Sequence, residues 1–557
     1  MKAKFFLFLF LVLYAPKVLS QAENNNWYYG LNAGLNFNTN NNTTSVLLDN
    51  IITEQLTSAG TVSNKVSGTL LFTTDGKFVY NKNFIKMTNS ATGAINSFAL
   101  GQSGLIVPSI ANRNLYYVFS PTLFNGLLYS VVDMTQDNGL GDIDQTQKGQ
   151  PMYDEFGSPF TLKSLAVTVV PNNLGNGYWV LYPTNNKLYT YRIDGNGFSP
   201  NPVTFTTLTF TFNQSDSSLG INRIKGSPDG SRIGITVSGN NFNYTSTQTR
   251  FYSFNNATGA VDIANEIALN SQNIRQLEFS TNINNSNIVF YDNIVYGTGG
   301  NYTANLYGRD LNSSNTSLLY SANNIFNTCL QRTPNNEIYF SFSPRYVSQV
   351  SNPSIYNSSV LVDLINGNPD NPNPLRYTGS YMPQLIPKLN CALYEDLKGN
   401  NITNNYTYQV SNRITTSSDY TVNENQTINL FAKDYIEFKA NTHLKSNSTV
   451  WAKIQACPGS SGRMADENAI KNDAVSQSTN DLIIAPNPVT DFVLIKTSQT
   501  GFNKVTISSL DGKVVKTETV ENTMEYSLNA SGIAKGIYLI SVTSKEGSLL
   551  TQKLIKN

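Results

Sequence analysis

Histidine and cysteine are nearly missing from this sequence of 557 residues. It contains one histidine, His443, and three cysteines, Cys329, Cys391 and Cys457. One histidine excludes a Ser-His-Asp or Cys-His catalytic group in the first 395 residues and the usual histidine-based metal sites, and His443 itself is predicted to be a packed or surface residue. The cysteines are too few and too widely spaced for a disulfide scaffold or a zinc site. One pair, such as Cys391 with Cys457, would leave one thiol over.

Charge and long apolar runs are also scarce. Only 13% of the residues are charged, and 38 Lys+Arg face 37 Asp+Glu. Without a basic excess we expect no nucleic-acid partner. The apolar run at residues 5–14 follows two lysines and is shorter than the ~20 residues that span a bilayer. This pattern predicts a secretory signal peptide over residues 1–20, cleaved between Ser20 and Gln21. No later segment is long and apolar enough to span a membrane, so we expect a soluble or surface-attached mature protein.

Aromatic residues are abundant, with 31 Tyr and 29 Phe. They occur with many Thr, Val and Ile in short runs that alternate with Asn, Asp, Gly and Ser, which is typical of strands separated by turns. Residues 70–80 and 178–191 each place two such runs around Asp75-Gly76 or Asn185-Asn186. These residue pairs tolerate positive φ and therefore predict tight hairpins. We expect an all-β protein.

Several turns of similar composition predict the arrangement of these strands. Residues 73–76, 227–230 and 333–336 each deliver the chain into a strand, as at the inner hairpin of a propeller blade. Residues 251–259 resemble the outer strand and turn of a blade. At ~50 residues per blade, the region has room for about seven blades. We predict a β-propeller over residues 21–395, with a pair of β-sandwiches as the alternative.

The opening of this region carries a family resemblance. Residues 26–37, Asn-Trp-Tyr-Tyr-Gly-Leu-Asn-Ala-Gly-Leu-Asn-Phe, resemble the "NWYFGxxAGLxF" element that begins a family of large secreted Bacteroidetes proteins. Further matches lie at residues 68–76, 79–83, 133–142 and 329–339. The resemblance covers about residues 26 to 390. It implies an extracellular propeller and no agreed chemistry.

The pattern of apolar and polar residues changes after the predicted propeller. Residues 427–432 and 435–440 alternate between apolar and polar side chains, which predicts short strands with one buried face. This stretch, residues 396–457, resembles a small stacked-strand module that often precedes sorting domains, and the resemblance implies a spacer. Residues 458–480 are rich in Ser, Gly, Asn and Asp and predict a flexible linker.

Residues 481–557 have the strand spacing of a small Ig-like β-sandwich. The Pro-Asn-Pro opening, a Gly-Ile-Tyr strand and the terminal Lys-Leu-Ile-Lys closely resemble the type A C-terminal sorting domain of type IX secretion system substrates of Bacteroidetes. The residues that carry the resemblance are Pro486, Asn487, Pro488, Gly512, Gly536, Tyr538, Lys553, Leu554 and Lys556. It implies export through the periplasm and outer membrane, with the type IX translocon and the sortase-like attachment machinery as partners. An ordinary terminal Ig-like domain is the alternative.

Other candidate chemistry is sparse. Residues 137–144 contain oxygen ligands at short spacing but lack the EF-hand order, which favours a solvated turn over a calcium site. A propeller glycosidase would need no histidine. The residues that it could use are Arg223, Arg275, Arg309, Arg332 and Tyr339, which are scattered along the sequence. We find no phosphate-binding loop and expect no cofactor or metal.

The three tryptophans could form a carbohydrate or protein surface. Trp27, Trp179 and Trp451 each lie within an apolar strand pattern, however, and we predict core packing for all three. The sequence therefore favours a non-enzymatic secreted or cell-surface protein that binds a glycan or protein ligand. A carbohydrate-active propeller enzyme and a surface component of the type IX attachment machinery are the alternatives.

Overall fold

The computed structural model describes residues 22–457 and 482–556, apart from internal gaps of which the longest are 51–58, 211–219 and 367–381. The predicted cleavage site at Ser20 and Gln21 and the predicted linker lie outside the described residues. The chain divides into two compact units, Met1–Met464 and Ala465–Asn557. Within the described part, no helix is long and apolar enough to cross a membrane.

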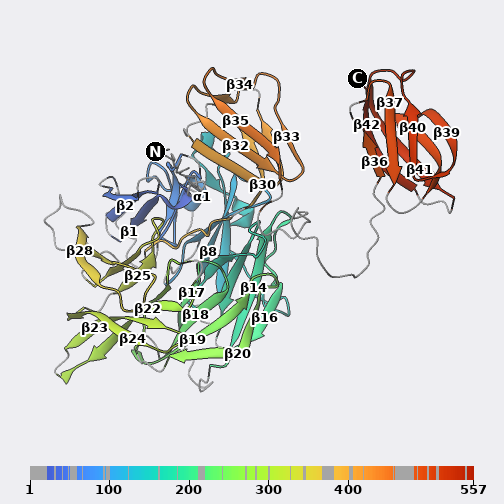
Figure 1. Cartoon of the computed structure of the whole chain (residues 1–557). Helices are drawn as coiled ribbons and strands as arrows, with labels where there is room; N and C mark the ends of the chain where they lie inside the picture. The colour runs from blue at the N-terminus through green and yellow to red at the C-terminus, as the bar shows by residue number, and fades with distance from the viewer. Residues whose placement is uncertain are drawn as a thin grey trace, which may run out of the picture. The chain divides into compact units, whose positions relative to one another are not determined.

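In the described part of residues 26–366, seven antiparallel sheets follow one another along the chain (Figure 1). The first three contain β1 (Asn26–Tyr29), β2 (Ala33–Asn38) and β3 (Thr43–Val46); β4 (Gly60–Ser63), β5 (Leu70–Thr74) and β6 (Val79–Asn81); β7 (Leu105–Pro108), β8 (Leu115–Pro121), β9 (Leu127–Asp133), β10 (Asp142–Ile143) and β11 (Gln150–Pro151). Short helical turns accompany them at η1 (Ala22–Asn24), α1 (Thr88–Ala91), η2 (Asp137–Gly139) and η3 (Gln145–Gln147).

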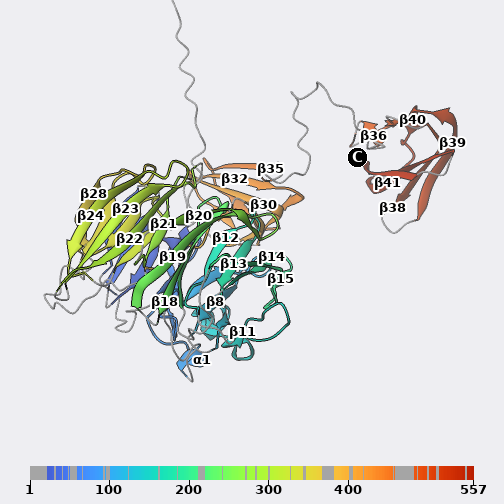
Figure 2. The ribbon, with the colours of Figure 1, turned by 90° about the horizontal axis from the view of Figure 1, so that it is seen from below.

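The other four sheets complete this region. They contain β12 (Thr168–Pro171), β13 (Tyr178–Pro183), β14 (Lys187–Asp194), β15 (Gly197–Phe198) and β16 (Thr204–Thr207); β17 (Gly220–Gly226), β18 (Arg232–Asn240), β19 (Asn243–Asn255) and β20 (Ala260–Leu269); β21 (Leu277–Phe279), β22 (Ile288–Tyr296), β23 (Tyr302–Asp310) and β24 (Thr316–Asn323); β25 (Cys329–Arg332), β26 (Ile338–Ser341), β27 (Tyr346–Val350) and β28 (Val360–Asn366). Figure 2 shows the last three of these sheets side by side.

The seven sheets form a closed ring with their first strands innermost. Strand β4 contacts β1 and β7, and β12, β17, β21 and β25 contact one another in that order. The ring closes where the last sheet packs on the first: the rings of Phe37 and Tyr339 lie 6.0 Å apart, and the Tyr339 hydroxyl donates to Thr44 Oγ1 at 3.1 Å. This arrangement is a β-propeller and confirms the predicted fold, so the alternative of two sandwiches is wrong.

The predicted turns lie between strands of one blade. Residues 227–230 join β17 to β18 and residues 333–336 join β25 to β26, so both are inner hairpins as predicted. Gly230 and Asn336 supply the positive φ that these turns require, 68° and 60°. The turn at 73–76 instead joins β5 to β6, the second and third strands of its sheet, because an earlier strand, β4, occupies the innermost position.

The module after the propeller is built from parallel strands. Strands β29 (Ala392–Leu397), β30 (Asn405–Thr416), β32 (Thr427–Ala432) and β35 (Thr449–Ile454) form one sheet, joined by β33 (Tyr435–Glu437). Strand β31 (Thr421–Val422) pairs with β34 (His443–Leu444). Asn405, Thr427 and Thr449 are register partners, 22 residues apart from one coil to the next. The module is therefore a short β-solenoid, and the alternating burial of β32 confirms the predicted one-sided strands.

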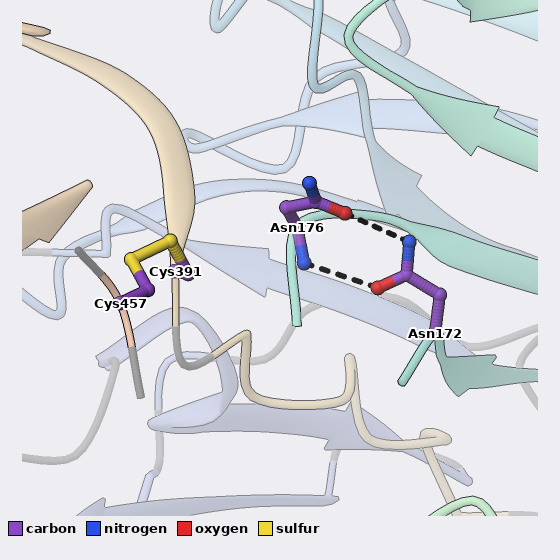
Figure 3. Close-up of a disulfide and its surroundings, with 4 residues drawn as sticks. All are labelled: Asn172, Asn176, Cys391 and Cys457. Atoms are coloured by element: carbon purple, nitrogen blue, oxygen red, sulfur yellow. Dashed lines mark hydrogen bonds between the residues drawn. A yellow bond between two sulfur atoms is a disulfide. The ribbon is translucent and has the colours of Figure 1, made fainter. Parts of the chain in front are cut away.

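A disulfide joins the two ends of this solenoid, and polar contacts fasten the solenoid to the propeller. Cys391 and Cys457 are bonded, and the Cys391 N–H donates to Gly175 O at 3.0 Å, in the turn held by Asn172 and Asn176 (Figure 3). Lys65 pairs with Glu395. The third cysteine, Cys329, is a buried thiol. The bond encloses the solenoid between its two cysteines.

The C-terminal unit is a β-sandwich, as predicted. One sheet contains β36 (Leu482–Ala485), β37 (Phe492–Thr497) and β40 (Glu525–Asn529). The other contains β38 (Phe502–Ser509), β39 (Val514–Thr523), β41 (Gly536–Ser544) and β42 (Leu549–Lys556). Buried residues of both sheets, among them Val493, Ile507 and Ile540, form one hydrophobic core.

Candidate functional site

The inner strands of the propeller carry a buried cluster of charges. Lys225 of β17 and Glu278 of β21 are 3% and 0% exposed, and Lys225 Nζ lies 2.9 Å from Glu278 Oε2. Arg332 of β25 places its Nε 2.9 Å from Glu278 Oε1 and donates through Nη2 to Gly226 O at 2.7 Å. Buried charges need such partners because an unpaired one carries a large desolvation cost. The cluster thus links three consecutive blades.

Burial and pairing oppose each other in this cluster. Burial lowers the pKa of Lys225 below its ordinary value, although the charge of Glu278 acts in the other direction. Burial would raise the pKa of Glu278, but the positive charges of Lys225 and Arg332 outweigh it and hold that pKa below its ordinary value. Glu278 is therefore an ionised carboxylate held by two cations.

A second buried group lies beside the first. Asp292 of β22 accepts from the backbone N–H groups of Arg275 and Gln276 at 2.7 and 2.6 Å and from the Thr328 hydroxyl. Burial raises the pKa of Asp292. Arg223 donates to the Gln276 side chain. These bonds tie the fifth, sixth and seventh blades together.

The structure separates the arginines considered for catalysis. Arg223, Arg275 and Arg332 lie at the inner strands, as described above. Arg309 of β23 instead donates to Thr316 Oγ1 at 3.0 Å, and Tyr339 belongs to the contact that closes the ring. The five residues therefore do not meet in one site.

Acidic side chains of residues 137–144 accept hydrogen bonds from backbone N–H groups. Asp142 Oδ1 accepts from the N–H groups of Asn89 and Ile143 at 3.0 and 2.8 Å. Asp144 caps η3 by accepting from the Thr146 N–H at 2.9 Å. Among the residues that the structure describes, no group of three or more His, Cys, Asp or Glu could hold a metal ion.

The sorting motif gathers around the terminal strand of the sandwich. The Asn487 side chain donates to Lys553 O and accepts from the Ile555 N–H, both at 2.8 Å. The Val489 N–H donates to Ile555 O at 2.7 Å. An amide side chain thus pairs with β42 as a strand backbone would. Pro486, Pro488 and Gly512 lie outside the described residues.

The rest of the motif lies along β41 and β42. Leu554 is fully buried in the sandwich core and is the register partner of Tyr538, whose hydroxyl donates to Ala534 O at 2.9 Å. Gly536 is the partner of Lys556. The structure therefore brings six motif residues to one strand pair and its neighbouring chain: Asn487, Gly536, Tyr538, Lys553, Leu554 and Lys556.

One surface feature was not predicted. Trp27 and Trp179 are buried as predicted, but Trp451 in β35 is 58% exposed, so its predicted core role is wrong. Within the described residues β35 is the last strand of its sheet, and no further coil covers it. The solenoid also has a polar groove of about 480 Å³ that includes Arg413, Tyr435 and Glu437. The 22-residue spacing of the coils was the sequence signal that could have revealed this stacking.

Comparison with known proteins identifies one part of the chain by family. Residues 483–557 match the family described as the secretion system C-terminal sorting domain. Among curated proteins, no sequence matches this chain.

Three solved structures show distant similarity to this chain. The GH74 enzyme of Niastella koreensis is 12% identical over 63% of this chain and 54% of its own, with a TM-score of 0.35. The WD40 domain of SCAP from fission yeast is 8% identical over 58% and 92%, with a TM-score of 0.29. Sqt1 of Saccharomyces cerevisiae is 7% identical over 82% and 86%, with a TM-score of 0.27. Similarity at this level carries no argument about activity.

Proposed function

We propose that this chain, which its C-terminal sorting domain directs to export through the type IX secretion system, is a binding or adhesion-type protein whose ligand is a glycan or a protein. The sorting domain implies interaction with the export machinery and secretion or attachment to the cell surface. The ligand and the binding role are our proposal.

The burial of Glu278 carries this proposal. A glycoside hydrolase needs two carboxyl groups that flank the scissile bond of a substrate. Glu278 is the carboxylate placed among the inner strands with cationic neighbours, yet it is fully buried and held by Lys225 and Arg332. Its pairing is structural, which favours a scaffold that presents a binding surface over a carbohydrate-active enzyme.

Binding and turnover measurements on the mature protein test the proposal. We expect a glycan array or a pull-down from the native environment to identify a ligand that binds the protein saturably. We also expect soluble polysaccharides to keep their chain length when they are incubated with the protein. Turnover that disappears when a propeller carboxylate is replaced would support the carbohydrate-active enzyme instead.

We further propose that the sortase-like attachment machinery reads the sorting domain at β42 and Asn487. The motif residues that resemble the type A signal converge there through two hydrogen bonds between the Asn487 side chain and the terminal strand. The intact mass of the surface form tests this step. A passenger that is processed should lack the residues after the linker, whereas a retained domain would contradict the proposal.

A further inference from the structure

The parallel register of the solenoid places polar and aromatic residues of neighbouring strands in rows across the sheet. Asp396, Thr415 and Glu437 are successive register partners on β29, β30 and β33. Tyr394, Arg413 and Tyr435 are partners in the same way, two residues earlier along each strand. Side chains two residues apart share a face of a strand. The two rows therefore lie on one face of the sheet.

A third row extends this face just beyond the strands. Lys398, Ser417 and Lys439 follow two residues after Asp396, Thr415 and Glu437, and the Ser417 N–H continues the ladder by donating to Leu397 O at 2.7 Å. The groove of about 480 Å³ is lined by all three of these residues together with Arg413, Tyr435 and Glu437. We call the three rows the rung surface. It contains an aromatic row, an acidic row and a lysine row.

Part of the rung surface is occupied by its own contacts and part is open. Asp396 Oδ1 accepts from Arg413 Nη1 at 2.7 Å and from the Thr415 hydroxyl, and the Arg413 guanidinium lies 4.8 Å from the centre of the Tyr394 ring. These contacts fix the centre. In the part of the chain that the structure describes, no hydrogen bond or ion pair engages the side chains of Glu437 and Lys439, and Tyr435 is 46% exposed.

We propose that the rung surface binds an acidic polysaccharide, a chain of uronic acid units. An exposed tyrosine ring can stack on the apolar face of a sugar while its hydroxyl stays in water. Glu437 can accept from sugar hydroxyls, and Lys439 and Lys398 can pair with uronate carboxylates. Lys398 also lies near the Asp419 carboxylate and helps to lower its pKa.

The spacing of the strands selects an extended chain. Neighbouring strands lie ~4.8 Å apart, close to the length of one pyranose unit. A polysaccharide that runs across the strands would thus meet one rung per sugar. A binding role for the solenoid goes beyond the spacer role that its resemblance implies, and it does not require a ligand on the propeller.

Affinity measurements with the full mature chain test this inference. Polygalacturonate oligomers serve as the acidic probe, and neutral galactan oligomers of equal length serve as the comparison. We expect saturable binding of the acidic probe and at least a tenfold loss in the K398Q/K439Q variant and in Tyr435→Ala. The matched control is Lys445→Gln, which removes a lysine of β34's flank that lies outside the groove. Thermal unfolding should be unchanged in all three, because the altered side chains are exposed.

Several results would overturn the inference. These are no binding of polygalacturonate, equal binding of the neutral oligomer, an equal loss in Lys445→Gln, or equal binding of poly-glutamate, which would show a response to charge alone. A ligand found on the propeller would leave the proposed function standing even if the rung surface binds nothing.

Discussion

Glu23 shows what burial does to a single ionisable side chain. It lies in η1, and burial is the main cause that raises its pKa from 4.5 to about 7; Lys65 lowers the pKa and Glu395 raises it. Its Oε2 atom has no hydrogen-bond partner among the described residues. Near neutral pH the folded protein therefore holds a proton on Glu23 that the unfolded chain releases.

This shift predicts a loss of stability as the pH rises. Because the folded pKa lies above the unfolded one, the contribution of Glu23 is fully present below 4.5 and is lost as the pH rises through about 7. Relative to Glu23→Gln, which cannot ionise, we expect the wild type to lose about 2–3 kcal/mol of unfolding free energy across this interval. Urea denaturation below, within and above the interval measures the difference. Parallel pH profiles for the two proteins would contradict the assignment.

Apolar strand patterns predicted the burial of a side chain correctly where its strand is covered by neighbouring elements, and wrongly where one side of the strand is open. Trp27 and Trp451 both lie in apolar strand patterns, yet Trp27 sits between blades and Trp451 on a strand that nothing covers. Lys225 and Glu278 are 53 residues apart, and nothing local in the sequence indicates that they pair. Partners of this kind depend on how the blades are placed, which single strands do not encode.

The solenoid illustrates the same limit for whole elements. Alternation at residues 427–432 correctly predicted a strand with one buried face. Alternation says nothing about the partner strand, and parallel pairing comes from the constant coil length instead. Tyr406, Ile428 and Val450 are register partners because each follows the previous one by 22 residues. The rung surface follows from this register and has no short sequence motif of its own.

The disulfide is expected to stabilise the solenoid. It closes a loop between residues 66 apart, and removing it should cost about 4 kcal/mol in the chain-entropy view. Adding a reductant should therefore lower the melting temperature of the wild type. The Cys391→Ser/Cys457→Ser variant should melt at the lower temperature with or without reductant. If reductant shifts both proteins equally, the stabilisation comes from elsewhere.

Asn487 should protect the terminal strand of the sorting domain. Its side chain makes two hydrogen bonds to β42, each worth roughly 0.5–1.5 kcal/mol. Asn487→Leu removes both and should raise the hydrogen-exchange rate of the Ile555 amide about tenfold. Ser541→Ala is the control: it removes an exposed hydroxyl contact between β41 and Thr551 of β42, four residues before Ile555, and should leave the Ile555 amide unchanged. Equal exchange rates in Asn487→Leu and wild type would argue against the contact.

At the scale of the whole molecule, the sequence predicted the architecture better than any site. The length of the region, divided by the ~50 residues that one blade needs, predicted the number of blades because every blade needs a similar length of chain. The sorting domain was predicted from nine motif residues, of which the structure brings six together. The strand that follows a given turn was predicted wrongly at residues 73–76, because turn residues look alike at inner and outer hairpins.

The division into two units predicts how export depends on the C-terminal domain. Residues 483–557 match the sorting family and form their own core, so deleting residues 481–557 should leave the propeller folded but trap it in the periplasm. Cell fractionation followed by limited proteolysis measures both effects. The control is a point variant at Trp451, in the solenoid, which keeps the sorting domain and should still reach the surface. Normal delivery of the truncated chain would overturn the role of the domain.

The contact that closes the ring also sets an order in time. Tyr339 and Thr44 are 295 residues apart, so the first blade has no neighbour on one side until the seventh has formed. Contacts this distant in sequence fold slowly because the chain entropy is lost before they form. The sandwich, by contrast, forms its core from residues 484–554 alone, so its folding does not require the propeller. We therefore expect its export signal to be complete while the propeller is still an open arc, a stage at which β1 exposes Trp27 to chaperones and proteases.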